Sequence, residues 1–587
     1  MLGLDLKLDA LEKRKEARVQ NENKFREQMV ETYEEFETET ISSTSSEEEI
    51  QDVDNFENET IADPSKCKRA RKNLMTPRLT FALDKCKISD RDAIHIITAC
   101  IEAASLNIDD FVLSRSSIKR ARENFRKEGN YKMKSKFFDL NLNFVVIHWD
   151  SKILADITGK ANVDRLPVVT TAPGLEQLLG VPALSSGTGL EISSAVYDNL
   201  QDWALLDKIQ AFVVDTTASN TGRVNGACIL LEQKLNRNIL LLACRHHMYE
   251  VVLQGVFHET KLCVMSGPDI PIFKKFQKNW VNINKKNFST WMTDSYVRDK
   301  LGYIALNILN FAENKIKEDF PRNDYRELLE LIIIFLGGTP LNGIQFRQPG
   351  AYHLARWMAK AIYCFKIYIF RHQIFVVITC YAENWFTCMD PIEAPLNDIF
   401  FLRKLVSYKD INPSIANVAI KKFCNHVWYL NEETVMFSIF DERILIEDKR
   451  RIVQIILQEN YEEDLEVPKR ITLKPEEIPE FIKRDIPFEL FTKNSLKFFS
   501  RFKISSEFLN IDPVEWKNNL EYNNAREIIS SIKVVNDTAE RNVKLMEDFN
   551  QKITKNEEQK QFLLQVVKDY RKNYSGHSRE VLTKSLE

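Results

Sequence analysis

The sequence predicts an α/β fold, in which short buried strands alternate with helices, joined to a long helical region. Two observations carry this prediction. Apolar, partly β-branched runs at 145–147, 211–214 and 239–243 are typical of strands buried on both faces. Between and after them, helical spacing gives the order strand, strand, helix, strand, helix, strand, helix. A chain of 587 residues is expected to form two to four folding units.

The first 75 residues are expected to form a disordered acidic tail. Residues 27–64 hold fourteen acidic residues and no Lys or Arg, with too little apolar content to order themselves. The tail ends in the run KCKRARK, which is typical of a nuclear localisation signal, although a solvated basic run is the alternative. We therefore expect a nuclear protein whose import signal contains Lys66, Lys68, Arg69, Arg71 and Lys72.

Residues 76–135 are expected to form a small helical unit. Ser89 is placed to cap a helix that begins at Asp90. The following run SRSSIKRARENFRK predicts a helix rich in cations, which is a candidate for contacts with DNA phosphates, with a solvated basic face as the alternative. The candidate phosphate contacts are Lys119, Arg120, Arg122, Arg126 and Lys127.

Residues 136–260 contain two acidic residues that directly follow predicted strands. A strand over 138–147 leads to Asp150, RLPVVTT predicts a neighbouring strand, and a helix is expected over 193–209. The run AFVVDTTASNTG then places Asp215 at the carboxyl end of a strand, where open α/β sheets hold their sites. The alternative is that Asp215 only caps a helix beginning near Gly222.

The strand over 239–243 runs into a helix that begins with Cys244, Arg245, His246 and His247. The pair Cys244 and His247 is too small for a structural zinc site, which needs four ligands. We expect His246 or His247 to satisfy buried polar groups or to orient a nearby carboxylate. A plain core histidine is the alternative.

The rest of the chain is expected to be helical. Residues 261–510 form a helical domain, with helices predicted over 325–338 and 450–458. Residues 511–560 carry one apolar stripe from Ile528 to Ile553, which predicts a single helix with Glu540 beside the stripe. Glu540 could reach a cleft from there, or it could be a solvated charge. Residues 561–587 form a C-terminal helix and tail that cover the core or meet a second subunit.

Composition limits the classes of protein that fit. No run approaches the ~18 uncharged residues of a membrane span, and the N-terminus lacks the apolar segment of a signal peptide. The ten cysteines follow no disulfide or zinc pattern, which favours a reducing intracellular setting. A net charge of −3 means that any surface for DNA must be local.

Four places in the sequence resemble the hAT superfamily of DNA transposases. They are Asp215 with Ser219 and Asn220, the pair Cys244 and His247, the dipeptide Arg356-Trp357, and the run Ala539-Glu540-Arg541. The resemblance implies a ribonuclease H-like core interrupted by a large all-helical insertion. It also implies that Asp150, Asp215 and Glu540 hold Mg²⁺ or Mn²⁺ as catalytic acids, supported by His247. Arg356 and Trp357 would add to the contacts with DNA.

The chain also departs from the family. It has no paired Cys and His at zinc-finger spacing before residue 130, and Ala539, Asn542 and Val543 replace residues of the family's third motif. We therefore expect a hAT-like transposase that cleaves and joins DNA through metal-dependent chemistry. The alternatives are a domesticated, catalytically inactive nuclear module that binds DNA or protein, and an unrelated helical scaffold. DNA is the expected partner, a homo-oligomer is implied only by resemblance, and neither a membrane nor a small-molecule substrate is expected.

Overall fold

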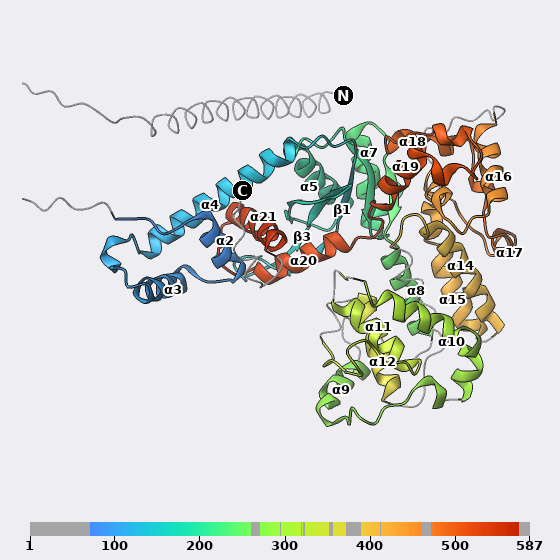
Figure 1. The fold of residues 1–587 in the computed structure, drawn as a ribbon, viewed down its shortest axis with the longest axis horizontal. Helices are drawn as coiled ribbons and strands as arrows, with labels where there is room; N and C mark the ends of the chain where they lie inside the picture. The colour runs from blue at the N-terminus through green and yellow to red at the C-terminus, as the bar shows by residue number, and fades with distance from the viewer. Residues whose placement is uncertain are drawn as a thin grey trace, which may run out of the picture. The chain divides into compact units, whose positions relative to one another are not determined.

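The structure is a computed structural model that describes residues 71–259, 271–293, 295–318, 320, 323–350, 356–370, 389–410, 412–458 and 471–574. In these ranges the chain is a mixed α/β protein, with helices packed around a five-stranded sheet (Figure 1). Residues 1–70 of the predicted acidic tail lie outside the described residues, and with them Lys66, Lys68 and Arg69. Residues 71–75, which were predicted as the end of this tail, instead pack on the helical unit, where Met75 is buried. None of the helices in these ranges combines the length and apolar character that a membrane span requires.

The N-terminal helical unit contains α2 (Pro77–Lys85), α3 (Asp90–Ala103), η1 (Ile108–Asp110) and α4 (Arg115–Phe138). Ser89 caps α3 as predicted, because its hydroxyl accepts a hydrogen bond from the Asp92 amide at 3.1 Å. Helix α4 is longer than predicted and runs through Phe138. The strand predicted over 138–142 is therefore wrong. Phe137 anchors the end of α4 through an edge contact with Trp203 at 5.0 Å between ring centroids.

The main sheet consists of β1 (Val145–Trp149), β4 (Val168–Ala172), β5 (Leu175–Gly180), β7 (Ile209–Val214) and β8 (Leu240–Ala243). Their order across the sheet is β5-β4-β1-β7-β8. Strands β5, β4 and β1 pair antiparallel, whereas β7 pairs parallel with β1 and β8 pairs parallel with β7. The carboxyl ends of β1, β7 and β8 consequently lie at one edge of the sheet.

A smaller antiparallel sheet follows β1 in the chain. It contains β2 (Lys152–Ala155), β3 (Asn162–Arg165) and β6 (Ala183–Leu184), in the order β2-β3-β6. Arg165 at the end of β3 donates two hydrogen bonds to the Glu557 carboxylate, at 2.5 and 2.9 Å. The small sheet is thereby tied to the start of the C-terminal helix.

Helices cover both faces of the main sheet. One face packs against α5 (Gly189–Asp202) and α7 (Ala227–Leu235), and the other against α8 (Arg245–Glu259), α20 (Asp537–Phe549) and α21 (Glu557–Asn573). Helix α5 begins and ends earlier than predicted. Its first turn is capped by Thr188, and Ile209 already belongs to β7.

Every element described between 271 and 510 is helical. Two contacts join this region to the core. Arg245 pairs with the buried Asp398 at 2.9 Å, and Arg501 donates hydrogen bonds to the carbonyls of Gln210 at 3.4 Å and Asn238 at 3.2 Å. The elements from 271 to 530 are α9 (Pro271–Asn279), η2 (Trp280–Asn282), η3 (Trp291–Thr293), α10 (Ser295–Lys315), α11 (Asn323–Phe335), α12 (Arg356–Ile369), α14 (Ala394–Ser407), η4 (Tyr408–Asp410), α15 (Pro413–Cys424), η5 (Val427–Tyr429), η6 (Thr434–Phe440), α16 (Ile446–Leu457), α17 (Ile478–Phe481), η7 (Phe488–Leu490), η8 (Lys493–Leu496), α18 (Lys497–Arg501), η9 (Glu507–Asn510), η10 (Trp516–Asn518) and α19 (Leu520–Ser530).

The single helix predicted from Ile528 to Ile553 is wrong, because α19 ends at Ser530 and α20 begins at Asp537. The connecting residues include a β-branched run, which is a poor helix former. Asn536 then donates a hydrogen bond to the carbonyl of Trp149 at 2.7 Å. This contact fixes the point at which α20 starts, next to the end of β1.

Candidate active site

Asp150 and Asp215 lie at the same edge of the main sheet. Asp150 directly follows β1, and Asp215 directly follows the adjacent parallel strand β7. The pairing of His148 with Val213 places both acids two residues beyond the same register position. Asp150 is buried and Asp215 is half-buried. The structure therefore brings these two predicted site residues together.

The loop after β7 holds the Asp215 carboxylate in place. Its Oδ1 atom accepts hydrogen bonds from the Thr217 amide at 3.2 Å, the Thr217 hydroxyl at 2.6 Å and the Asn220 side-chain amide at 2.5 Å. Asn220 also accepts a hydrogen bond from the Trp149 indole at 2.9 Å. Asn220 thus links the residue before Asp150 to Asp215. Asp215 does not cap α7, whose N-cap is Gly226.

The first turn of α20 carries Glu540 to the same edge. The Asn536 side chain is bonded to the carbonyl at the end of β1, and the Asn536 amide donates to the Cys244 thiol at 3.3 Å. Cys244 directly follows β8. Burial raises the pKa of the Cys244 thiol to about 12, and the nearby Glu540 carboxylate adds to the increase. In the ranges that the structure describes, no three His, Cys, Asp or Glu side chains are grouped so that they could hold a metal ion.

A buried polar cluster sits at the start of α20. It contains His246, which was expected to meet a buried polar group or a carboxylate, together with Asp537 and Tyr325, which the sequence analysis missed. The Asp537 carboxylate accepts hydrogen bonds from the Tyr325 hydroxyl at 2.7 and 2.8 Å, and His246 Nδ1 lies 3.1 Å from Asp537 Oδ1. His247 is half-buried, with Nδ1 3.7 Å from the Glu250 carboxylate. Tyr325 is 212 residues from Asp537 in sequence, so no local spacing could indicate this pair.

A second cluster fixes the next turn of α20 to the sheet. Glu176 on β5 pairs with Arg541 at 2.6 Å and with Lys568 of α21 at 3.0 Å. Burial opposes ionisation of Glu176, but Lys568 and Arg541 outweigh it and lower the pKa of the carboxyl group. Arg541, predicted as part of the third motif, therefore anchors the helix that carries Glu540.

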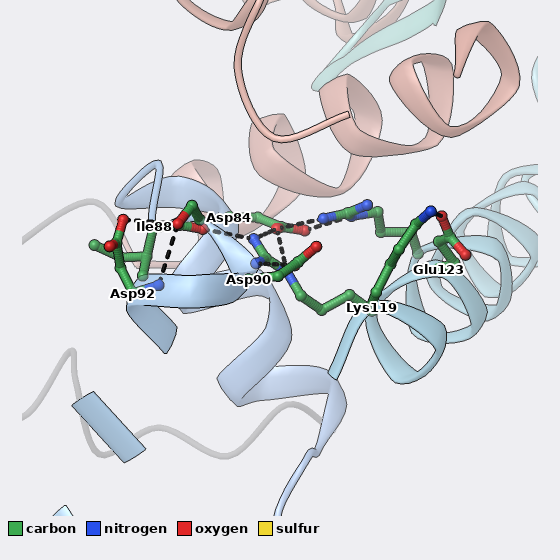
Figure 2. A network of polar contacts seen from close by, with 9 residues as sticks. Asp84, Ile88, Asp90, Asp92, Lys119 and Glu123 are labelled. Atoms are coloured by element: carbon green, nitrogen blue, oxygen red, sulfur yellow. Dashed lines mark hydrogen bonds and ion pairs between the residues drawn. The ribbon is translucent and has the colours of Figure 1, made fainter. Parts of the chain in front are cut away.

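The predicted DNA-contacting residues of α4 fall into two groups. Arg122 and Arg126 are buried, and both guanidinium groups bind the buried carboxylate of Asp84, while Arg122 also binds Asp90 at 2.7 Å (Figure 2). Both arginines are therefore removed from the candidate DNA surface, because their charges are enclosed in the helical unit. The other three predicted residues, Lys119, Arg120 and Lys127, are exposed and stay candidates for contacts with DNA.

The other predicted positions are placed only in part. Arg71 and Lys72 are exposed, and the Lys72 amide donates to the carbonyl of Asp110 at 2.7 Å, which ties this segment to η1. Arg356 and Trp357 begin α12, but their side chains lie outside the described residues.

The sequence matches neither a model of a known protein family nor a curated protein.

Proposed function

We propose that the chain is a hAT-like DNA transposase whose ribonuclease H-like core performs divalent-metal-dependent DNA cleavage and strand transfer. The observation that carries the proposal is the pair of acids, Asp150 and Asp215, at the carboxyl ends of adjacent parallel strands. A helix from the far end of the sequence brings Glu540 to the same edge.

The sheet supports the proposed core. Three antiparallel strands come first in the chain, and two parallel strands then follow, each reached through a helical connection. The first acid stands after the central strand β1, and the second after its parallel neighbour β7. The long helical region enters between β8 and the helix that carries the third acid, as the resemblance implies.

The residues present fit a hard divalent cation. Mg²⁺ takes oxygen ligands and keeps several waters, so one or two carboxylates are enough to hold it. In the described part of the chain, the hydrogen bonds to Asp215 all use Oδ1, and none uses Oδ2. Asp150 and Asp215 would hold Mg²⁺ or Mn²⁺, with Glu540 completing the site. Two divalent metal ions bound in this way would activate an attacking oxygen and stabilise the leaving oxygen of a phosphodiester.

The protein's own residues would orient these acids. Thr217 and Asn220 fix the Asp215 carboxylate, and Asn536 sets the start of α20 against β1. His247, in the first turn of α8, would support the scissile phosphate. The exposed cations Lys119, Arg120 and Lys127 would contact the DNA backbone, and the basic run at 66–72 would direct the protein to the nucleus.

The test of this proposal is Mg²⁺- or Mn²⁺-dependent nicking of DNA by the purified chain. We expect Asp215→Asn to abolish nicking, because the substitution removes one charge from the proposed ion site. Asp207→Asn is the matched control, since Asp207 is exposed and precedes the opposite end of β7. Equal nicking by Asp215→Asn and wild type would refute the assignment of this centre.

A domesticated module without catalysis is the second candidate. One observation favours it: the Thr217 and Asn220 bonds would hold Asp215 in a stable turn even without any ion. This alternative predicts DNA or protein binding with no metal-dependent nicking by the wild-type chain.

A further inference from the structure

The segment from Pro271 to Thr293 has a charge pattern that the proposed site does not use. It contains five lysines and no Asp or Glu, within a chain whose net charge is −3. The segment forms α9, η2 and η3 at the start of the helical insertion. Its positive charge is therefore local, as a surface for a polyanion requires.

Apolar contacts decide which side of the segment faces inward. Phe273 stacks on Tyr363 of α12 with ring centroids 4.9 Å apart, and the buried Trp280 ring meets Phe370 at 5.6 Å. The Ser289 amide also donates to the carbonyl of Ile369 at 2.8 Å. The segment thus packs along α12 (Figure 1).

The polar side is left on the surface. After η2 the chain turns back, so that the Lys285 ammonium lies 5.1 Å from the centre of the Trp280 ring. Trp280 follows Lys278 by two residues in the sequence. This fold gathers cations and side-chain amides from both parts of the segment. The exposed polar residues are Lys274, Lys278, Asn282, Asn284, Lys285, Lys286 and Asn287, and we call this set the α9 surface.

Two acids of α11, the helix that packs against α12, already have partners. On α11, Glu327 pairs with the buried Lys366 at 2.5 Å, and Glu330 pairs with Arg347 at 3.3 Å. In the described ranges, Lys278, Lys285 and Lys286 pair with no carboxylate. Their charges are thus not neutralised within this part of the molecule.

We propose that the α9 surface binds the phosphate backbone of DNA, as a second contact region separate from α4. Lysine ammonium groups and asparagine amides are common donors to phosphate oxygens, and such contacts position a protein without reading sequence. The inference rests on the proposed function, because it assigns the DNA that the active site would cut to an additional surface. It needs neither the metal nor the three acids.

The experiment measures binding of a labelled 30-base-pair duplex of arbitrary sequence, in EDTA, over a range of salt concentrations. The variant is Lys278→Glu/Lys285→Glu/Lys286→Glu. Each lost phosphate contact reduces the slope of log K against log salt by about 0.9, so three lost contacts reduce it by about 2.7. The matched control is Lys474→Glu/Lys493→Glu/Lys517→Glu, which changes the charge equally at three other exposed lysines.

We expect the first triple variant to lose slope and the control to keep it. A triple Gln variant at 278, 285 and 286 tests the same contacts without adding negative charge, and circular dichroism verifies folding. An unchanged slope in both the Glu and Gln variants would overturn the proposal. Loss of binding to phosphatidylserine vesicles with unchanged DNA binding would also overturn it, in favour of a membrane surface.

The outcome can be separated from that of the nicking test. The slope is measured in EDTA, where metal-dependent nicking cannot occur, so it reports on the α9 surface independently of the reaction at Asp215. If the wild type does not nick DNA but the slope falls in the triple variants, the surface stands and the catalytic proposal fails. If nicking depends on Asp215 but the slope does not change in the triple variants, the catalytic proposal stands and the α9 surface proposal fails.

Discussion

Asp84→Asn should strongly destabilise the N-terminal helical unit. The Asp84 side chain is fully buried and accepts hydrogen bonds from two arginines that are themselves buried. Arg126 Nε donates to Oδ2 at 2.7 Å, and Arg126 Nη2 and Arg122 Nη2 donate to Oδ1 at 2.8 and 2.5 Å. An asparagine offers one acceptor oxygen, and its NH₂ group would face a guanidinium donor.

The size of the stability loss follows from the two buried guanidinium groups that remain after the Asp84→Asn substitution. Removing one member of a buried ion pair leaves an uncompensated charge and costs about 3–5 kcal/mol. Asp90→Asn is the matched control, because Asp90 is partly exposed and its carboxylate pairs with one of these arginines, Arg122. We expect Asp90→Asn to lower the free energy of unfolding by about 1 kcal/mol. This loss combines that of a weak ion pair near the surface with that of a negative charge at the start of a helix.

Urea unfolding, followed by circular dichroism of the purified chain, measures both variants. A loss below 1 kcal/mol for Asp84→Asn would refute the reasoning. Replacing all three charged groups by apolar ones, as Asp84→Leu/Arg122→Met/Arg126→Met, should recover most of the lost stability. The triple variant should also bind DNA with an unchanged salt slope, because these arginines are enclosed. A reduced salt slope would instead show that Arg122 and Arg126 contact DNA.

Three further predictions concern the sheet edge. Asn220→Ala should reduce metal-dependent nicking by at least tenfold while leaving duplex binding in EDTA unchanged, because it removes one of the three hydrogen bonds that hold the Asp215 carboxylate and the link from Asp215 to Trp149. Tyr325→Phe should cost about 1–3 kcal/mol in urea unfolding, since it removes the hydroxyl whose hydrogen bond is shared between both oxygens of the buried Asp537 carboxylate, and an unchanged stability would argue against this contact. Burial lowers the pKa of His148 from 6.5 to about 3, so its contribution to stability is complete above about pH 6.5 and is lost as the pH falls toward 3. Between pH 7.5 and 5 in EDTA, the wild type should lose about 2 kcal/mol more than His148→Gln in urea unfolding, and equal losses would refute the burial argument.

Strands β1, β4, β7 and β8 were predictable because their residues are almost all buried, whereas the more exposed strands β2, β3, β5 and β6 were not predicted. Apolar runs before Asp150, Asp215 and Cys244 coincide with β1, β7 and β8. Pairing was not predictable from these runs, since every residue is apolar and no face is distinguished. The edge shared by the two aspartates follows from the observed parallel pairing of β1 and β7.

The basic helix shows where a local interpretation fails. Arg122 and Arg126 follow Ile118 at four-residue steps, so they share the face of α4 that carries a buried apolar side chain. This spacing was a usable signal that the two arginines point inward. Their partner Asp84 lies in another helix, 38 and 42 residues away, which composition alone cannot identify.

The helix with the third acid depends on contacts over still longer distances in sequence. Asn536 binds the end of β1, Asp537 binds Tyr325 of the insertion, and Arg541 binds Glu176 of β5. Three separate segments therefore determine where the first turns of α20 lie, and Glu540 stands between the second and third of these anchors. Because one anchor comes from α11, the helical region helps to set the position of Glu540. A change in the packing of this region would then be transmitted to the sheet edge through Asp537.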